Sequence, residues 1–103
     1  MTFRVEITSE EDVILARLAA RKAAVRLGFS LVDQTRIITV VSELARNIFL
    51  YAGSGWVEGM EVSNLTGGIG LEFVFKDSGP GINDPDSAMA GGYFQRHGVG
   101  PGP

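Results

Sequence analysis

Apolar and polar residues alternate at the start of the chain and then change to a helical spacing. In 3–7 every second residue is apolar, which is the period of a strand with one buried face. Ser9 and Asp12 then form a capping-box pattern, with Ser9 as the N-cap of a helix. Apolar residues follow at intervals of three and four: Val13, Ala16, Ala20, Ala23 and Leu27. The pattern predicts a strand and then an amphipathic helix that stops at Gly28.

A second helix is predicted from Ser30 to about Ala52, because this stretch contains no Gly or Pro and begins with another capping-box pattern. Its apolar face is wide: Ile37, Ile38, Val41, Leu44, Ala45, Ile48 and Phe49. Two strands follow, one starting near Trp56 and one over 69–76, joined by a hairpin connection at 64–68. The apolar residues of the second strand share one face: Ile69, Leu71, Phe73 and Phe75.

The order strand, helix, helix, strand, strand predicts an α+β fold. Two helices can cover one face of an antiparallel sheet, which gives a two-layer sandwich. After Gly81 the pattern is interrupted by Pro80, Pro85, Gly91 and Gly92, so an irregular segment is expected there. The 103 residues show no repeat and no second domain, so a single domain over 1–103 is predicted.

Charge and composition exclude several classes of function. The formal net charge is −3, which disfavours nucleic acid as the partner. There is no Cys, and the single His97 cannot form a zinc site alone. No apolar run is long enough to span a membrane, and no signal-peptide pattern is present, so a cytoplasmic protein is expected. Basic residues that lie off the first helix's apolar stripe are interpreted as a solvated face: Arg17, Arg21, Lys22 and Arg26.

The candidate chemistry lies in two short motifs. Glu43 and Asn47 are four residues apart and so share one helix face, which suits a carboxylate base beside a neutral ligand for a hard cation. Asp77-Ser78-Gly79-Pro80-Gly81 suits a turn where the backbone approaches a ligand closely. Simpler interpretations are a Glu43 side chain that points to solvent or pairs with Arg46, a buried hydrogen bond of Asn47, and an ordinary turn after the strand.

Taken together and in this order, the two motifs resemble the N box and G1 box of the GHKL (Bergerat-fold) ATPases and kinases. The stretch 28–36, with Tyr51-Ala52-Gly53, is most similar to the RsbT-type branch of anti-sigma-factor serine/threonine kinases. The resemblance covers 3–93 and implies the cofactors ATP and Mg²⁺. It implies Glu43 as the general base, or as the residue that orients the attacking group, and Asn47 as the Mg²⁺ ligand.

The resemblance also assigns roles in the adenine pocket and lid. Asp77 would accept the adenine amino proton, and Gly79 and Gly81 would let the backbone pass close to the base. Ile82 would wall the base pocket. The start of the ATP lid would be formed by Gly91, Gly92 and Tyr93.

The implied activity is phosphorylation of a serine on a partner anti-sigma-factor antagonist, a STAS-type protein, in a bacterial stress-response regulatory module. A partner phosphatase is a second candidate, and the oligomeric state stays open. Two other functions remain as alternatives: a non-catalytic module that docks a partner protein, and an ATP-hydrolysing member of the superfamily.

The last residues depart from the family pattern. The family has a second glycine box at the start of a helix that binds phosphate. Here Gly98, Gly100 and Gly102 alternate correctly, but Pro101 and Pro103 lack the N–H donors. We expect an incomplete domain with an atypical tail at about 94–103, which is either out of frame or the end of a short protein. The expectation is that adenine contacts survive and phosphate contacts mostly do not, which leaves open whether the chain is an active enzyme.

Overall fold

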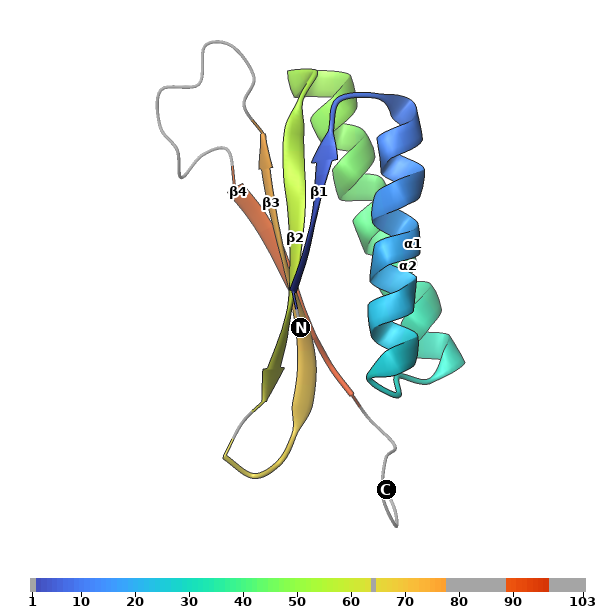
Figure 1. Cartoon of the computed structure of the whole chain (residues 1–103), viewed down its shortest axis with the longest axis vertical. Helices are drawn as coiled ribbons and strands as arrows, with labels where there is room; N and C mark the ends of the chain where they lie inside the picture. Colours follow the sequence, from blue (N-terminus) through green and yellow to red (C-terminus); the bar gives the residue numbers. More distant parts are fainter. Residues whose placement is uncertain (1, 64, 78–88, 97–103) are drawn as a thin grey trace.

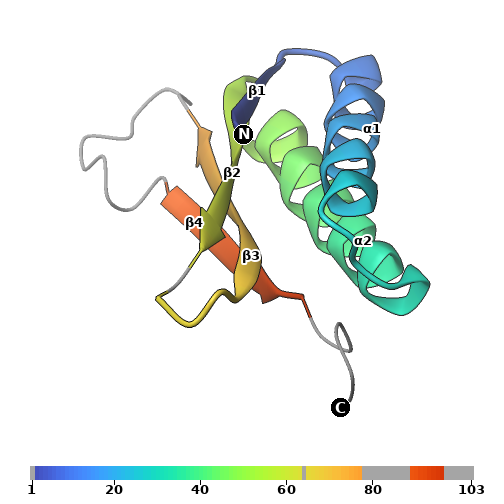
Figure 2. The same ribbon diagram turned by 60° about the horizontal axis from the view of Figure 1, so that its bottom comes forward.

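The computed structural model describes residues 2–63, 65–77 and 89–96 as a sheet covered by helices on one face (Figures 1 and 2). The elements in chain order are β1 (Thr2–Ile7), α1 (Glu10–Arg26), α2 (Leu31–Asn47), the π-helix η1 (Ile48–Ala52), β2 (Gly55–Ser63), β3 (Ile69–Asp77) and β4 (Met89–Gln95). Within these residues, four strands form one sheet in the order β1-β2-β3-β4. Each neighbouring pair is antiparallel. The predicted α+β two-layer sandwich is confirmed.

Both helices begin where the capping patterns predict. Ser9 is the N-cap of α1, and the Asp12 carboxylate accepts a hydrogen bond from the Ser9 N–H at 3.1 Å. Ser30 is the N-cap of α2, and its hydroxyl oxygen accepts from the Asp33 N–H at 3.2 Å. These bonds satisfy N–H groups that have no partner within the helix, so the local sequence sets both starts.

The core lies between the helical layer and the inner face of the sheet. The predicted stripe of α1, from Val13 to Leu27, is buried, as are Ile37, Val41 and Ala45 of α2. Phe73 is fully buried at the centre of the sheet, with the rings of Phe3 and Phe94 each 6.0 Å from its own and that of Phe75 at 6.3 Å. Such aromatic contacts add to the stabilisation from apolar burial.

The expectation of an irregular segment after Gly81 is wrong for the last part of that segment. Met89–Gln95 forms β4, with Gly91 opposite Val74 and Gly92 opposite Phe73. The strand forms because β3 would otherwise present an unpaired row of N–H and C=O groups. Phe94 also packs against the core, which compensates for the poor strand propensity of the glycines.

The end of β4 is connected to the helical layer by Arg96. Its Nη1 donates a hydrogen bond of 2.9 Å to the Leu27 carbonyl at the end of α1, and its backbone N–H donates to the Ile69 carbonyl. The tail expected from about Phe94 therefore begins with residues that take part in the fold. Residues 97–103, including the alternating glycines, lie outside the described residues.

Candidate functional site

The described residues of the two predicted motifs lie at one end of the molecule, where α2 and β3 both finish (Figure 1). Of the second motif, only Asp77 is among the described residues. Asn47 is the last residue of α2, and Glu43 lies one turn before it on the same side. Both side chains are exposed, so neither is needed to fill the core. Glu43 forms no ion pair with Arg46, and Asn47 forms no buried hydrogen bond, within the part of the chain that the structure describes. The pair with Arg46 and the buried hydrogen bond of Asn47 are therefore not supported, whereas the exposure of Glu43 agrees with a side chain that points to solvent.

A change of helix type follows directly after Asn47. The helix continues to Ala52 as predicted, but from Ile48 it is a π-helix, which ends at Gly53 with φ of +82°. The Gly53 N–H donates to the carbonyls of Ile48 and Phe49, which closes the wide turn. Short π-helical turns of this kind are rare and occur often at functional sites.

The π-helical turn brings Ile48 against the paired ends of β2 and β3. Gly55 is the register partner of Asp77. A Cβ added at Gly55 would lie 2.7 Å from Cγ2 of Ile48 and 2.8 Å from Cα of Asp77. The glycine is required here because the helix end and the strand end pack with no room for a side chain. The contact places the end of α2 beside Asp77.

Asp77 itself carries an unused acceptor. Its Oδ1 is buried and accepts no hydrogen bond from the described residues. A buried acceptor without a donor costs about 1–3 kcal/mol, so it calls for a ligand or another donor. An amino group of a bound molecule would satisfy it, which fits the role that the sequence assigned to this residue.

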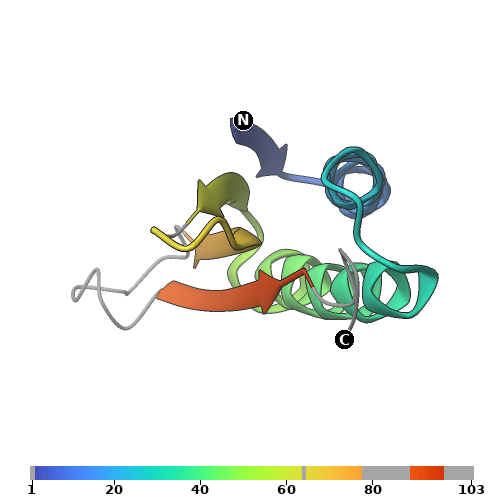
Figure 3. The same ribbon diagram turned by 90° about the horizontal axis from the view of Figure 1, so that it is seen from below.

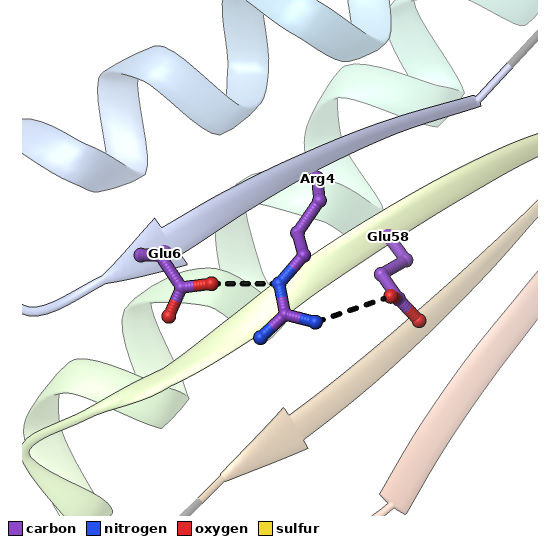
Figure 4. Close-up of polar contacts among 3 residues, drawn as sticks. All are labelled: Arg4, Glu6 and Glu58. Atoms are coloured by element: carbon purple, nitrogen blue, oxygen red, sulfur yellow. Dashed lines mark hydrogen bonds and ion pairs between the residues drawn. The ribbon is translucent and has the colours of Figure 1, made fainter.

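The outer face of the sheet next to this end is polar and aromatic. Trp56, which follows Gly55, has the Arg4 guanidinium 4.6 Å from its ring centre and the Lys76 ammonium at 6.0 Å. Figure 4 shows that Arg4 also pairs with Glu6 at 2.6 Å and with Glu58 at 3.6 Å. These contacts hold the Arg4 side chain against residues of β1 and β2, so we assign Arg4 a structural role.

The other predicted site residues are less well placed. Gly91, Gly92 and Tyr93 were expected in a lid, but they lie within β4, paired with β3. Tyr93 is half exposed, and its hydroxyl lies over Gly70. Their contact with nucleotide stays a prediction. Gly79, Gly81 and Ile82 lie outside the described residues.

Sequence reasoning missed Gly55 and Ile48 as residues that build the site. The sequence pattern placed Gly55 only just before the strand expected near Trp56, and Ile48 only on the apolar face of the second helix. The available signal was a glycine two residues after the stop at Gly53, at the start of a strand, where a close approach of two backbones is a common reason for it.

Comparison with known proteins identifies the family. Serine/threonine-protein kinase RsbT of Bacillus subtilis (strain 168) is 46% identical to the chain over 98 residues, which is 95% of this chain and 73% of the relative. The chain belongs to the RsbT-type serine/threonine-protein kinases. No family model matches it, and no solved structure matches it significantly.

Two further findings concern the described residues. Within 2–63, 65–77 and 89–96, no three His, Asp or Glu side chains gather as metal ligands. In the same residues no helix is long and apolar enough to cross a membrane.

Proposed function

We propose that this chain binds Mg-ATP at the shared end of α2 and β3 and transfers the terminal phosphoryl group to a serine of a partner protein. The observation that carries the proposal is the buried Asp77 Oδ1, which accepts no hydrogen bond from the residues that the structure describes. Membership of the RsbT-type kinases supports it, since the name of the relative states this class of activity.

Asp77 would bind the adenine. A carboxylate oxygen accepts a hydrogen bond from the exocyclic amino group of adenine, whereas guanine presents a carbonyl oxygen at that position, which the carboxylate would repel. The close packing of Gly55 against Ile48 supports this role, because it fixes the backbone on which the carboxylate is mounted.

Asn47 and Glu43 would serve the phosphate end. The Asn47 amide oxygen suits Mg²⁺, which binds few protein ligands and takes the rest from phosphate and water. When bound, the ion supplies positive charge that offsets the charge on the phosphate oxygens. Glu43, exposed one turn earlier, would accept the proton of the attacking serine hydroxyl.

The partner in this proposal is an anti-sigma-factor antagonist of the STAS type, within a bacterial stress-response module. The support is the family resemblance, in which a serine of such a protein is the acceptor. Glu43 and Asn47 are exposed, which leaves them accessible to the serine of a docked protein.

Thermal unfolding with and without Mg-ATP tests nucleotide binding. A ligand at about a hundredfold excess over Kd adds about 2.7 kcal/mol to the stability of the folded state. We expect this rise for the parent and not for Asp77→Asn, whose side chain carries no charge and presents one acceptor instead of two. An equal rise in both proteins would contradict adenine binding by Asp77.

Phosphoryl transfer is tested separately with Glu43→Gln. With labelled ATP and a STAS-type antagonist protein, we expect transfer to fall by about a hundredfold or more, while the ATP-dependent rise in unfolding temperature stays. Unchanged transfer would remove Glu43 from the mechanism. Partner binding by both proteins without any transfer would favour the non-catalytic docking module instead.

A further inference from the structure

The outer side of α1 carries a second apolar stripe, in addition to the one that packs in the core. Ile14, Leu18 and Val25 are 52%, 47% and 53% exposed. Their spacing of four and seven residues places them along one side of the helix. Figure 3, which views α1 nearly along its axis, shows β1 on one side of the helix and α2 on another, so the remaining side of α1 faces away from the described fold. Half-exposed aliphatic residues in a row indicate a surface that contacts something.

Two hollows lie along this stripe, and together they form a shallow groove. One hollow of about 330 Å³ is lined by Leu18, Arg21, Lys22, Val25 and Arg26. The other, of about 200 Å³, is lined by Ile14, Arg17, Leu18, Arg21 and Ile38. Leu18 and Arg21 line both, so the hollows lie next to each other along α1, and the second also borders α2 at Ile38. We call this surface the α1 groove.

Four cations border the α1 groove without a compensating charge. Arg17, Arg21, Lys22 and Arg26 are exposed, and none forms an ion pair or side-chain hydrogen bond within the described residues. Arg17 and Arg21 are four residues apart, as are Lys22 and Arg26, and like charges at that spacing destabilise a helix. The chain as a whole is acidic, with a net charge of −3, so this basic cluster is a local exception.

We propose that the α1 groove binds an acidic amphipathic helix of a partner protein. Apolar side chains of that helix would fill the hollows over Leu18 and Val25, and its carboxylates would meet the bordering cations. This is the helix-in-groove mode, in which anchors recur at every third or fourth residue.

Two other occupants fit the surface less well. In a symmetric dimer through this groove, the four cations of one copy would face the same four of the other, and the like charges would repel. An anionic lipid surface also attracts Arg and Lys beside an apolar stripe, but it presents no side chains that fill separate hollows, so a helix with apolar anchors fits these hollows better.

The inference does not depend on the kinase proposal. The groove uses α1 and one residue of α2, whereas the proposed nucleotide site uses Glu43, Asn47 and Asp77. Loss of ATP binding would leave the groove unchanged, and a non-binding groove would leave the ATP experiments unchanged.

The test uses the full chain and a labelled helical peptide of about five turns, with Leu at every third or fourth position and Glu on either side. Fluorescence anisotropy measures binding. We expect the affinity to fall by at least about tenfold for the double variant Arg21→Glu/Lys22→Glu and for Leu18→Gln. The matched control Arg36→Glu reverses an exposed charge on α2, outside the groove, and should bind like the parent.

A charge-swapped peptide, with Lys in place of Glu, should bind the double variant better than it binds the parent. The proposal is overturned if the Glu peptide does not bind, or if the double variant binds it as well as the parent. It is also overturned if vesicles with anionic lipid bind through these residues while the peptide does not. Light scattering that detects a dimer broken by Arg21→Glu/Lys22→Glu would overturn it in favour of a second copy.

Discussion

At the scale of single residues, two aspartates show how a structural carboxylate differs from a candidate functional one. The Asp12 Oδ2 accepts hydrogen bonds from the Thr8 N–H at 2.9 Å, the Thr8 hydroxyl at 3.0 Å and the Ser9 N–H at 3.1 Å. The Asp77 Oδ1 is buried and accepts none from the described residues. The chain completes the surroundings of Asp12 by itself, whereas those of Asp77 lack a donor. This difference supports a ligand at Asp77.

Asp12 gives a prediction on pH. The hydrogen bonds from Thr8, together with those from Ser9, lower the pKa of Asp12 below its usual value of 3.8. A lowered pKa in the folded state means that the ionised carboxylate stabilises the fold above the unfolded pKa, and that this contribution is lost as the pH falls through the folded value. We therefore expect Asp12→Asn to unfold at a lower temperature than the parent at pH 7. The gap should close as the pH falls below about 3.8.

The control for this prediction is Glu10→Gln, which removes another exposed carboxylate from the first turn of α1 but leaves the bonds of Asp12 in place. Melting curves of the three proteins test this prediction. They are recorded between pH 7 and pH 2, about the range in which carboxylates titrate. A gap for Asp12→Asn that stays constant over this range would show that the ionised form is not the one stabilised.

At the scale of elements, the site depends on a contact between the end of α2 and the strand pair β2–β3. A Cβ at Gly55 would overlap the Lys76 carbonyl oxygen and crowd Ile48 and Asp77. We expect Gly55→Ala to cost about 1–3 kcal/mol, which is about 5–20 °C in a domain of this size. Because the overlapping atoms are mostly backbone, the shift would also displace Asp77 and weaken the binding of Mg-ATP.

Gly70→Ala is the matched control in the same sheet. Its Cβ would meet the Tyr93 hydroxyl at 2.6 Å, at the far end of a half-exposed side chain that can swing away. We expect a loss of less than about 1 kcal/mol. Calorimetry of both variants would show whether the packing at Gly55 matters specifically; equal losses of stability would contradict it.

Elements with a strong local pattern could be predicted from the sequence. The α1 stripe from Val13 to Leu27, the N-caps Ser9 and Ser30, and the inward face of β3 are where the pattern places them. In each of these elements, burial and hydrogen bonding involve residues close together in the chain. The spacing of apolar and capping residues is therefore enough to predict the element. The positions of Glu43 and Asn47 on one side of α2 follow in the same way.

Features that depend on distant contacts could not be predicted. β4 forms because the edge of β3 needs a partner and Phe94 fills space beside Phe73, and neither cause is visible in the local pattern around Gly91 and Gly92. The π-helical turn after Asn47 is set by the packing of Ile48 on Gly55, which is seven residues away in the chain but on another element.

At the scale of the whole molecule, one side chain connects the last described strand to the helical layer. Arg96 Nη1 donates to the Leu27 carbonyl, 69 residues earlier in the chain. We expect Arg96→Met to cost about 1–2 kcal/mol, because it leaves this half-buried carbonyl without its donor. Denaturant titration measures the loss. Arg36→Met, which removes only an exposed pair with Asp33, should change stability by less than about 0.5 kcal/mol.

The sheet order also predicts how hydrogen exchange varies across the molecule. β2 and β3 are the central strands, paired on both sides, and contain the buried Val57, Phe73 and Phe75. β1 and β4 are paired on one side only within the described sheet. Amides of β2 and β3 should therefore exchange only by global unfolding, and those of the edge strands also by local opening.

The effect of Mg-ATP on this exchange pattern should show whether the nucleotide stabilises the whole folded chain or only a local part of it. If the nucleotide binds only the folded chain, a hundredfold excess over Kd slows exchange by global unfolding by roughly a hundredfold, equally in β2 and β3. Edge-strand amides that open locally, far from Asp77, should slow much less. In Asp77→Asn neither set should slow. A slowing confined to the edge strands, with β2 and β3 unchanged, would mean that ATP does not stabilise the folded chain, and the proposed site would have to be abandoned.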